Sequence, residues 1–291
     1  MLLQVEAYRN HPPTSEQDAL AIERLEKALQ LEPRSVEAMV ALSKVLLRPL
    51  MQFGPDETTK VRVRRAQNLI DEARKIAPDI RHVLDAQAVM LVTEGRWDEA
   101  QSAYRHLLDR YPDDVHLLNQ VAICSIVLGR SEEALPLLRK AVSLGPDDPW
   151  AFTHEANLGL AFVRLGRDGE AVEWLRRAKQ DAPVVPASVY SLLAAAYAQL
   201  GRIDDAHREL AAYIAKEPWV TVRWLRHRRR SSEVAVAERT REIDGLAKAG
   251  LRDHAEEDAD GGLAFPCRMS YPGSSPATNS MARSGIPSLR R

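Results

Sequence analysis

The chain has only two cysteines among its 291 residues, few aromatic residues (5%) and no long apolar run. Cys124 and Cys267 share no motif, so neither a disulfide framework nor a metal site is expected, and no cofactor is implied. No stretch approaches the roughly 18 consecutive apolar residues that span a bilayer, and the first ten residues lack the apolar region of a signal peptide. We therefore expect a cytoplasmic protein without a membrane partner.

An excess of charge of either sign is also missing, because 40 basic and 41 acidic side chains give a formal net charge of −1. Such a balance does not steer a protein toward nucleic acid, which is therefore not an expected partner. The sequence has no glycine-rich phosphate loop, no His-Glu-x-x-His and no Cys-x-x-Cys pair. We accordingly expect no catalytic residues and no enzymatic activity.

What the sequence does contain is a repeated phrase, Gly-Arg-x-x-(Asp/Glu)-Ala, at residues 95–100, 129–134, 166–171 and 201–206. The phrase recurs after 34, 37 and 35 residues. Prolines and small residues recur at the same three gaps, namely Pro112, Pro146, Pro183 and Pro218, and Ala88, Ala122, Gly159 and Ala194. A fixed period of this length is typical of a solenoid of supersecondary units.

Each part of the phrase has an explanation as a joint between two helices. A glycine just past a helix end adopts the left-handed conformation that closes the helix. Acidic residues such as Asp98 and Glu99 then begin the next helix, where their charge complements the helix dipole. The alanine lets the two helices approach closely, and a proline ends the unit. The phrase therefore predicts architecture, and its arginines need no catalytic role.

The period divides the chain into units of two helices each. Four clear units are expected at residues 81–114, 115–148, 152–185 and 187–220, preceded by a degenerate repeat at 1–35 and a repeat at 36–80 with a loop insertion at 48–60. Capping helices at 221–250 and a disordered tail at 251–291, rich in glycine, serine and proline, are expected to follow. Asp148 and Pro149 resemble a helix start, which predicts a helix that begins early and carries Trp150.

These units resemble the tetratricopeptide repeat, a helix–turn–helix of 34 residues. The resemblance rests on the small residues already given, on the alanines Ala100, Ala134, Ala171 and Ala206, and on the large residues Tyr104, Leu138, Leu175 and Leu210. It implies an all-α fold, a right-handed superhelical solenoid with a C-terminal capping helix and a disordered tail. It also implies that the first helix of each unit lines a concave groove.

A narrower resemblance involves residues 171–178, 192–206, 221–225 and 243–251. They are similar to the C-terminal repeat region of bacterial multidomain proteins that carry a class III adenylate cyclase or a winged-helix domain ahead of a TolB-like segment. Nothing in the chain resembles the cyclase or winged-helix domain, so no catalytic residue is transferred. The resemblance implies, as an alternative function, a regulatory or sensory module detached from such a protein and acting in signalling.

The tetratricopeptide resemblance also assigns the residues that line the groove. The polar ones are His82, Asp85, His116, Asn119, Gln120, Asn157, Arg164, Ser191 and Gln199. Because the lysines of a clamp for chaperone tails are missing, we expect an extended peptide or protein segment bound through side-chain amides. A solvated groove without a fixed ligand is the alternative. His82 and His116, with Asp85 and Asn119 one turn further on, are an alternative metal or pH-responsive site. Facing positions on stacked helices lie ~8–10 Å apart, which is long for shared ligation, so we expect no metal.

A cluster of basic residues follows the last repeat: Arg223, Arg226, Arg228, Arg229 and Arg230. It could contact phosphate or an acidic partner, or it could compensate the acidic repeats as the basic end of a helix. Self-association through exposed end helices is a further interpretation that the sequence leaves open.

Overall fold

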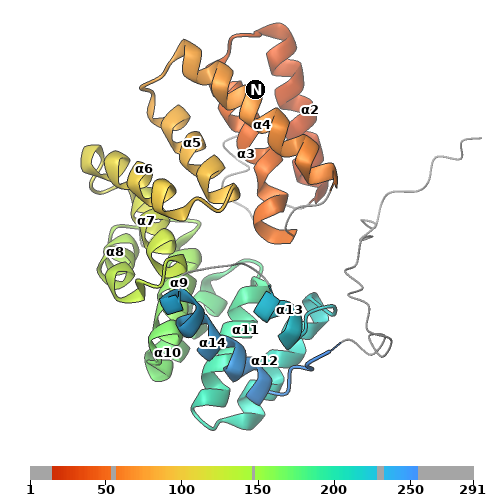
Figure 1. Cartoon of the computed structure of the whole chain (residues 1–291), viewed down its shortest axis with the longest axis vertical. Coiled ribbons are helices and arrows are strands. Elements are labelled where there is room, and N and C mark those ends of the chain that lie inside the picture. The colour runs from red at the N-terminus through yellow and green to blue at the C-terminus, as the bar shows by residue number, and fades with distance from the viewer. Residues whose placement is uncertain (1–14, 54–56, 146–147, 228–232, 255–291) are drawn as a thin grey trace, which may run out of the picture. The chain divides into compact units, whose positions relative to one another are not determined.

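The computed structural model describes residues 15–53, 57–145, 148–227 and 233–254, and within these ranges every regular element is an α-helix (Figure 1). The helices are α2 (Ser15–Leu31), α3 (Val36–Phe53), α4 (Glu57–Ile76), α5 (Arg81–Thr93), α6 (Trp97–Arg110), α7 (Val115–Val127), α8 (Ser131–Leu144), α9 (Ala151–Leu165), α10 (Asp168–Asp181), α11 (Ala187–Gln199), α12 (Ile203–Lys216), α13 (Val222–His227) and α14 (Glu233–Lys248). The all-α prediction is confirmed. Residues 1–14 of the expected degenerate repeat lie outside the described residues.

Each of the four clear units holds two helices, which form the pairs α5–α6, α7–α8, α9–α10 and α11–α12. The helices of a pair pack on one another, and the second helix of each pair packs on the first helix of the next. The first helices also contact one another, as α7 does with α9 and α9 with α11. The side of α5, α7, α9 and α11 that carries the expected groove residues is called the inner face below.

The repeated phrase forms the joint within each pair. Gly95, Gly129, Gly166 and Gly201 all adopt φ between 74° and 77°, the left-handed conformation expected from the sequence. The arginine that follows the glycine pairs with the acid three residues further on in three of the four joints, as Arg96 Nε does with Glu99 Oε1 at 2.7 Å. These arginines therefore fix the turn to the second helix.

Small residues decide how closely the two helices of a pair approach. The alanines of the phrase, Ala100, Ala134, Ala171 and Ala206, are completely buried. A Cβ atom on Gly159 of α9 would lie only 2.6 Å from Cδ2 of Leu175 on α10, and closer still to its Cγ. Tyr104 on α6 is buried as well, and its hydroxyl accepts a hydrogen bond of 3.1 Å from Nε2 of Gln120. The core of each repeat therefore pairs a small residue with a large one across the two helices.

Three expectations about element boundaries are wrong. The loop insertion expected at 48–60 is helical over most of its length, because α3 continues through Pro49 to Phe53 and α4 begins at Glu57. Leucine, methionine and glutamine after Pro49 favour a helix, and one proline removes only one backbone hydrogen bond. Helix α9 begins at Ala151, and Asp148 instead closes a turn in which its Oδ1 accepts from the Trp150 amide at 2.9 Å.

The third correction concerns the tail, which was expected to begin at residue 251. Leu251 is buried, and the carbonyl oxygen of Arg252 accepts a hydrogen bond of 3.0 Å from the amide of Val222 at the start of α13. Residues 251–254 therefore belong to the folded part of the chain. The remainder of the expected tail lies outside the described residues.

Candidate functional site on the inner helices

A buried carboxylate joins α3, α5 and α7 at the N-terminal end of the inner face. Asp85 on α5 is 3% exposed, and it pairs with Lys44 on α3 and with Nε2 of His116 on α7, which lies 3.2 Å from Asp85 Oδ1. Burial alone would raise the pKa of the Asp85 carboxyl. The hydrogen bond with His116 and the charge of Lys44 outweigh burial and lower this pKa below its usual value. Asp85 is therefore a charged structural anchor between repeats.

A pair of asparagines connects the next two inner helices. Nδ2 of Asn157 on α9 donates to Oδ1 of Asn119 on α7 at 2.8 Å, and both side chains are half-buried. This bond leaves donor and acceptor positions on both amides for other groups. Gln120 turns instead toward Tyr104. The open half of the inner face is defined as His82, Asp85, His116, Asn119, Gln120 and Asn157.

The other half of the inner face is covered by helix α14, which crosses α9 and α11 (Figure 1). Arg164 on α9 donates through Nε to Oε2 of Glu242 at 2.9 Å. Gln199 on α11 donates to the carbonyl oxygen of Arg241 at 3.1 Å and accepts from Lys248 at 2.6 Å. The expectation that Arg164 and Gln199 line an open groove is therefore wrong, because the cap folds back onto the repeats.

Ser191 is also withdrawn from solvent. It is 7% exposed and its hydroxyl donates to the carbonyl oxygen of Ser188 at 2.9 Å. The covered half is defined as Arg164, Ala195 and Gln199 of the inner face, together with Ser131 at the start of α8 and Asp168 at the start of α10. Asp168 pairs with Arg241, and Ser131 donates to Oε2 of Glu238 at 2.5 Å.

Two glycines mark where α14 comes closest to the repeats. A Cβ atom on Gly245 of α14 would lie 2.8 Å from the carbonyl oxygen of Ala195 and 2.9 Å from its Cα. At the other end, a Cβ on Gly129 would lie 2.5 Å from the amide nitrogen of Ala235. The two helix crossings therefore depend on the absence of a side chain on one partner.

Sequence reasoning missed the position of α14, although α11 carries a signal for it. Residues 191–198 of α11 are all buried, and this helix reads Ala-Ser-Val-Tyr-Ser-Leu-Leu-Ala-Ala-Ala-Tyr-Ala-Gln. A helix that is apolar on all sides needs a neighbour on each side. In a two-layer array the inner side of such a helix would face water. The run Leu192–Ala198 therefore indicates that another element covers it.

The basic cluster divides between described and undescribed residues. Arg226 pairs with Asp244 of α14, whose Oδ1 lies 3.3 Å from Arg226 Nη2, and Arg223 is half-buried on α13. Arg228, Arg229 and Arg230 lie outside the described residues. The pair of Arg226 and Asp244 is exposed on both sides, and such pairs contribute little to stability.

A second buried carboxylate lies away from the inner face. Glu155 on α9 is 1% exposed, and Nε of Arg177 lies 2.5 Å from its Oε1, yet neither carboxylate oxygen accepts a hydrogen bond of good geometry. Burial raises the pKa of the Glu155 carboxyl to about 7, against the attraction of Arg177. The adjacent His154 is buried as well, and burial lowers its pKa.

Replacing Glu155 by glutamine is expected to remove a pH dependence from the free energy of unfolding. Because the folded-state pKa lies above the ordinary 4.5, the stability that this group contributes falls as the pH rises from about 4.5 to about 7. The advantage of Glu155→Gln over the wild type should grow by on the order of 1–3 kcal/mol from about pH 5 to about pH 8. Urea unfolding across this range measures the difference in free energy of unfolding between the variant and the wild type. His154 is present in both proteins, so its opposite contribution cancels in this difference. A constant difference would contradict the assignment.

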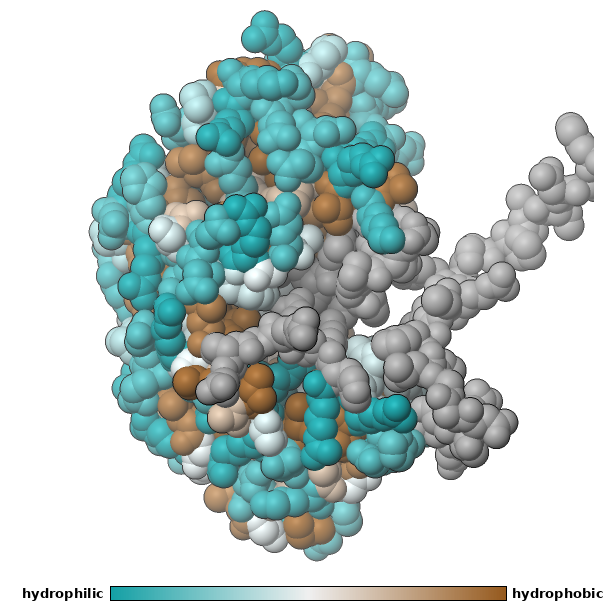
Figure 2. Space-filling view, viewed as in Figure 1, coloured by the Kyte–Doolittle hydropathy of each residue, from teal (hydrophilic) through white to brown (hydrophobic). Residues whose placement is uncertain are grey.

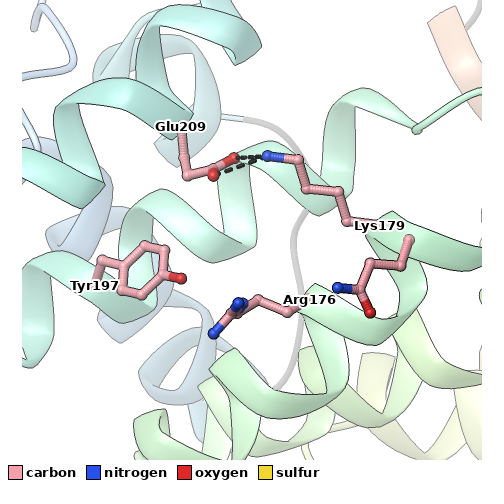
Figure 3. Close-up of a pocket in the computed structure, with 5 residues that line it drawn as sticks. Arg176, Lys179, Tyr197 and Glu209 are labelled. Carbon is pink, nitrogen blue, oxygen red and sulfur yellow. Dashed lines mark hydrogen bonds and ion pairs between the residues drawn. The ribbon is translucent and has the colours of Figure 1, made fainter.

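A small pocket between α10, α11 and α12 offers no site for chemistry (Figure 3). Its volume is about 340 Å³ and it is lined by Arg176, Lys179, Gln180, Tyr197 and Glu209. The ammonium group of Lys179 is already bound to both oxygens of Glu209, at 2.8 and 2.9 Å.

Cys124 on α7 is buried, which raises the pKa of its thiol to about 12 and keeps it protonated at neutral pH.

On the face drawn in Figure 2, hydrophilic side chains dominate and apolar ones lie in small groups between them. Among the described residues no helix is both long and apolar enough to cross a membrane. The same part of the chain holds no cluster of three or more histidine, cysteine, aspartate or glutamate side chains arranged for a metal ion. The inner face is thus distinguished by the polar side chains of its open half and by helix α14, which covers its other half.

Comparison with known proteins agrees with the helical repeat. Residues 86–149 match the family model of the tetratricopeptide repeat. The PilF protein of Pseudomonas aeruginosa is similar in structure, with a TM-score of 0.52, 15% sequence identity, and coverage of 75% of this chain and 91% of PilF. PilW, described as a type IV pilus biogenesis factor, has a TM-score of 0.51 at 19% identity, over 71% of this chain and 90% of PilW.

At these identities the two structures show the fold alone. A comparison with curated protein sequences finds no match. The family model and the paired helices coincide over α5 to α8, where each pair has its joint at a glycine with positive φ. Residues 86–149 are therefore tetratricopeptide repeats, and the chain has the fold of a tetratricopeptide repeat protein.

Proposed function

We propose that the chain is a non-catalytic scaffold that binds an extended peptide or protein segment on the open half of its inner face. Tetratricopeptide repeat proteins act as scaffolds for protein interactions. The observation that carries the proposal is the Asn119–Asn157 pair, which bridges adjacent inner helices at 2.8 Å. A backbone has alternating donors and acceptors along its length, and an asparagine amide can bond to both kinds of group.

The surroundings of the pair support this assignment. His116 is exposed beside it and is held by Asp85, whose charge is balanced by Lys44. The open half therefore presents neutral amides and the imidazoles of His82 and His116, without a free excess of charge of either sign. Such a surface favours a ligand recognised through its backbone over one recognised through strong charge.

Replacing Asn119 and Asn157 together by alanine is expected to weaken peptide binding at least about tenfold, because two hydrogen bonds of about 1 kcal/mol each are lost. Ten-residue peptides selected from a random library against the wild-type chain are the probe, and fluorescence polarisation gives their affinity. Asn68→Ala is the matched control, because Asn68 is an exposed asparagine on α4, a helix that does not belong to the inner face. If the double variant binds the selected peptides as tightly as Asn68→Ala does, the proposal fails.

The alternative, a regulatory module detached from a cyclase or winged-helix regulator, rests on the resemblance of residues 171–178 and 192–206 to such proteins. Its test is genetic. A cyclase or winged-helix domain encoded by the neighbouring reading frame would favour it, and unrelated neighbours would count against it.

A further inference from the structure

Helix α14 binds the covered half through one of its faces. The residues of this face recur at intervals of three or four: Ala235, Glu238, Glu242 and Gly245. The two glutamates accept hydrogen bonds from Ser131 and Arg164, and Gly245 lies against Ala195. This face therefore combines two carboxylates one turn apart with a residue that has no side chain where the helices cross.

The covered half is shaped for this face by the repeats themselves. Arg164 of α9 and Ala195 of α11 lie on the side of the repeats that α14 covers. Arg164 and Glu242 are 13% and 18% exposed, so their pair is largely shielded from water. The helix thus occupies a surface that the repeat leaves available for binding.

We propose that the covered half is a binding site for an amphipathic helix and that α14 is its built-in ligand. The partner that fits the site is a helix with two acidic side chains four residues apart, followed three residues later by glycine. Arg164 and Ser131 receive the two carboxylates, and the backbone of Ala195 admits only a small residue at the crossing. A partner helix of this pattern binds in place of α14.

The fit of α14 to its site is incomplete, so that a competitor can gain by replacing it. Nε of Arg241 and Oδ1 of Asp168 are both buried without a hydrogen-bond partner, although the two side chains form an ion pair through other atoms. Buried polar atoms left unsatisfied favour any arrangement that satisfies them. This inference concerns the covered half alone and does not rest on peptide binding by the open half.

A labelled peptide of residues 233–251 tests the proposal on the full-length chain. In the wild type α14 occupies the site, so the peptide binds only to the small fraction of molecules in which α14 is released. Glu242→Arg opposes Arg164 in the chain's own α14 and leaves the repeats unchanged. We expect the peptide to bind this variant at least about tenfold more tightly than the wild type.

Arg164→Glu is the matched variant, because it also releases α14 but destroys the site. We expect this variant to bind the wild-type peptide no more tightly than the wild-type chain does. We expect it to bind a peptide that carries Glu242→Arg at least about tenfold more tightly than it binds the wild-type peptide. Asp244→Arg, on the exposed side of α14, should behave as the wild type. Gly245→Gln provides a second route to release, because its side chain meets the Ala195 backbone.

Equal, weak binding of the peptide to Glu242→Arg, Gly245→Gln and the wild type would overturn the proposal, provided that circular dichroism shows the variants to be helical. Light scattering of the wild type supplies a second outcome. A monomer agrees with α14 bound within its own chain. A dimer that exchanges α14 between copies would assign the site to a second copy of the chain and overturn the proposal.

Discussion

Changing Glu242 to arginine is expected to lower the free energy of unfolding by about 2–4 kcal/mol. The guanidinium group of Arg164 would then face a second guanidinium group in a site where the native side chains are only 13% and 18% exposed. The loss cannot exceed the free energy that holds α14 on the repeats, because α14 can detach and restore solvent to both charges. Urea unfolding followed by circular dichroism measures the change.

The control for this change is Asp244→Arg on the same helix. Asp244 and its partner Arg226 are 46% and 54% exposed, so their pair is screened by water. We expect a loss of at most about 1 kcal/mol. Equal losses for the two variants would mean that the position of Glu242 against α9 has no special importance.

Replacing Gly159 by alanine is expected to cost about 1–3 kcal/mol, because one methyl group overfills the contact between α9 and α10. The new Cβ would lie 2.6 Å from Cδ2 of Leu175 and closer still to its Cγ, and Leu175 is itself completely buried. An alanine would normally stabilise a helix relative to glycine. The sign of the effect therefore separates packing from helix propensity, and thermal and urea unfolding both report it.

Two matched variants test that explanation. Gly169, at the start of α10, has no atom within 4 Å of the position of a Cβ, so Gly169→Ala should stabilise the chain by about 0.4–1 kcal/mol. Leu175→Ala creates space beside residue 159, so adding Gly159→Ala to it should cost less than in the wild type. A stabilising effect of Gly159→Ala alone would contradict the observed contact.

The helical repeat could be predicted from sequence because its determinants are local. Gly95 and its three counterparts require a left-handed conformation that few other residues adopt, and acidic residues at the following helix start agree with the dipole. The small residue at Gly159 and the large one at Leu175 lie 16 positions apart within one unit, a spacing that the repeat fixes. Each signal is present in several units, so a unit in which one signal is weak can still be assigned from its spacing to the others.

Which part of the inner face is covered could not be predicted in the same way. The period identifies Arg164 and Gln199 as inner positions, but it cannot say what covers them, because α14 lies outside the repeat and contacts residues up to 107 positions earlier. Long-range contacts of this kind are made once and leave no period. The apolar run Leu192–Ala198 was the available signal, because an inner helix with one side in water would carry polar residues on that side.

The burial of Asp85 and Glu155 also escaped prediction, and for a related reason. Both lie between helices, and their pKa values depend on partners from other helices. Asp85 has Lys44 and His116 within reach, whereas the oxygens of Glu155 accept no hydrogen bond of good geometry. The same kind of group, a buried carboxyl, is therefore charged in one site and near its titration point in the other.

The binding of α14 to the inner face is tested most directly by a double-mutant cycle between Arg164→Glu and Glu242→Arg. Each single change should destabilise the chain, and the two together should restore an ion pair of opposite orientation and recover at least half of the summed loss. We expect a coupling energy above about 1 kcal/mol in urea unfolding. Losses that simply add in the double variant, within about 0.3–0.5 kcal/mol, would show that α14 does not lie on α9.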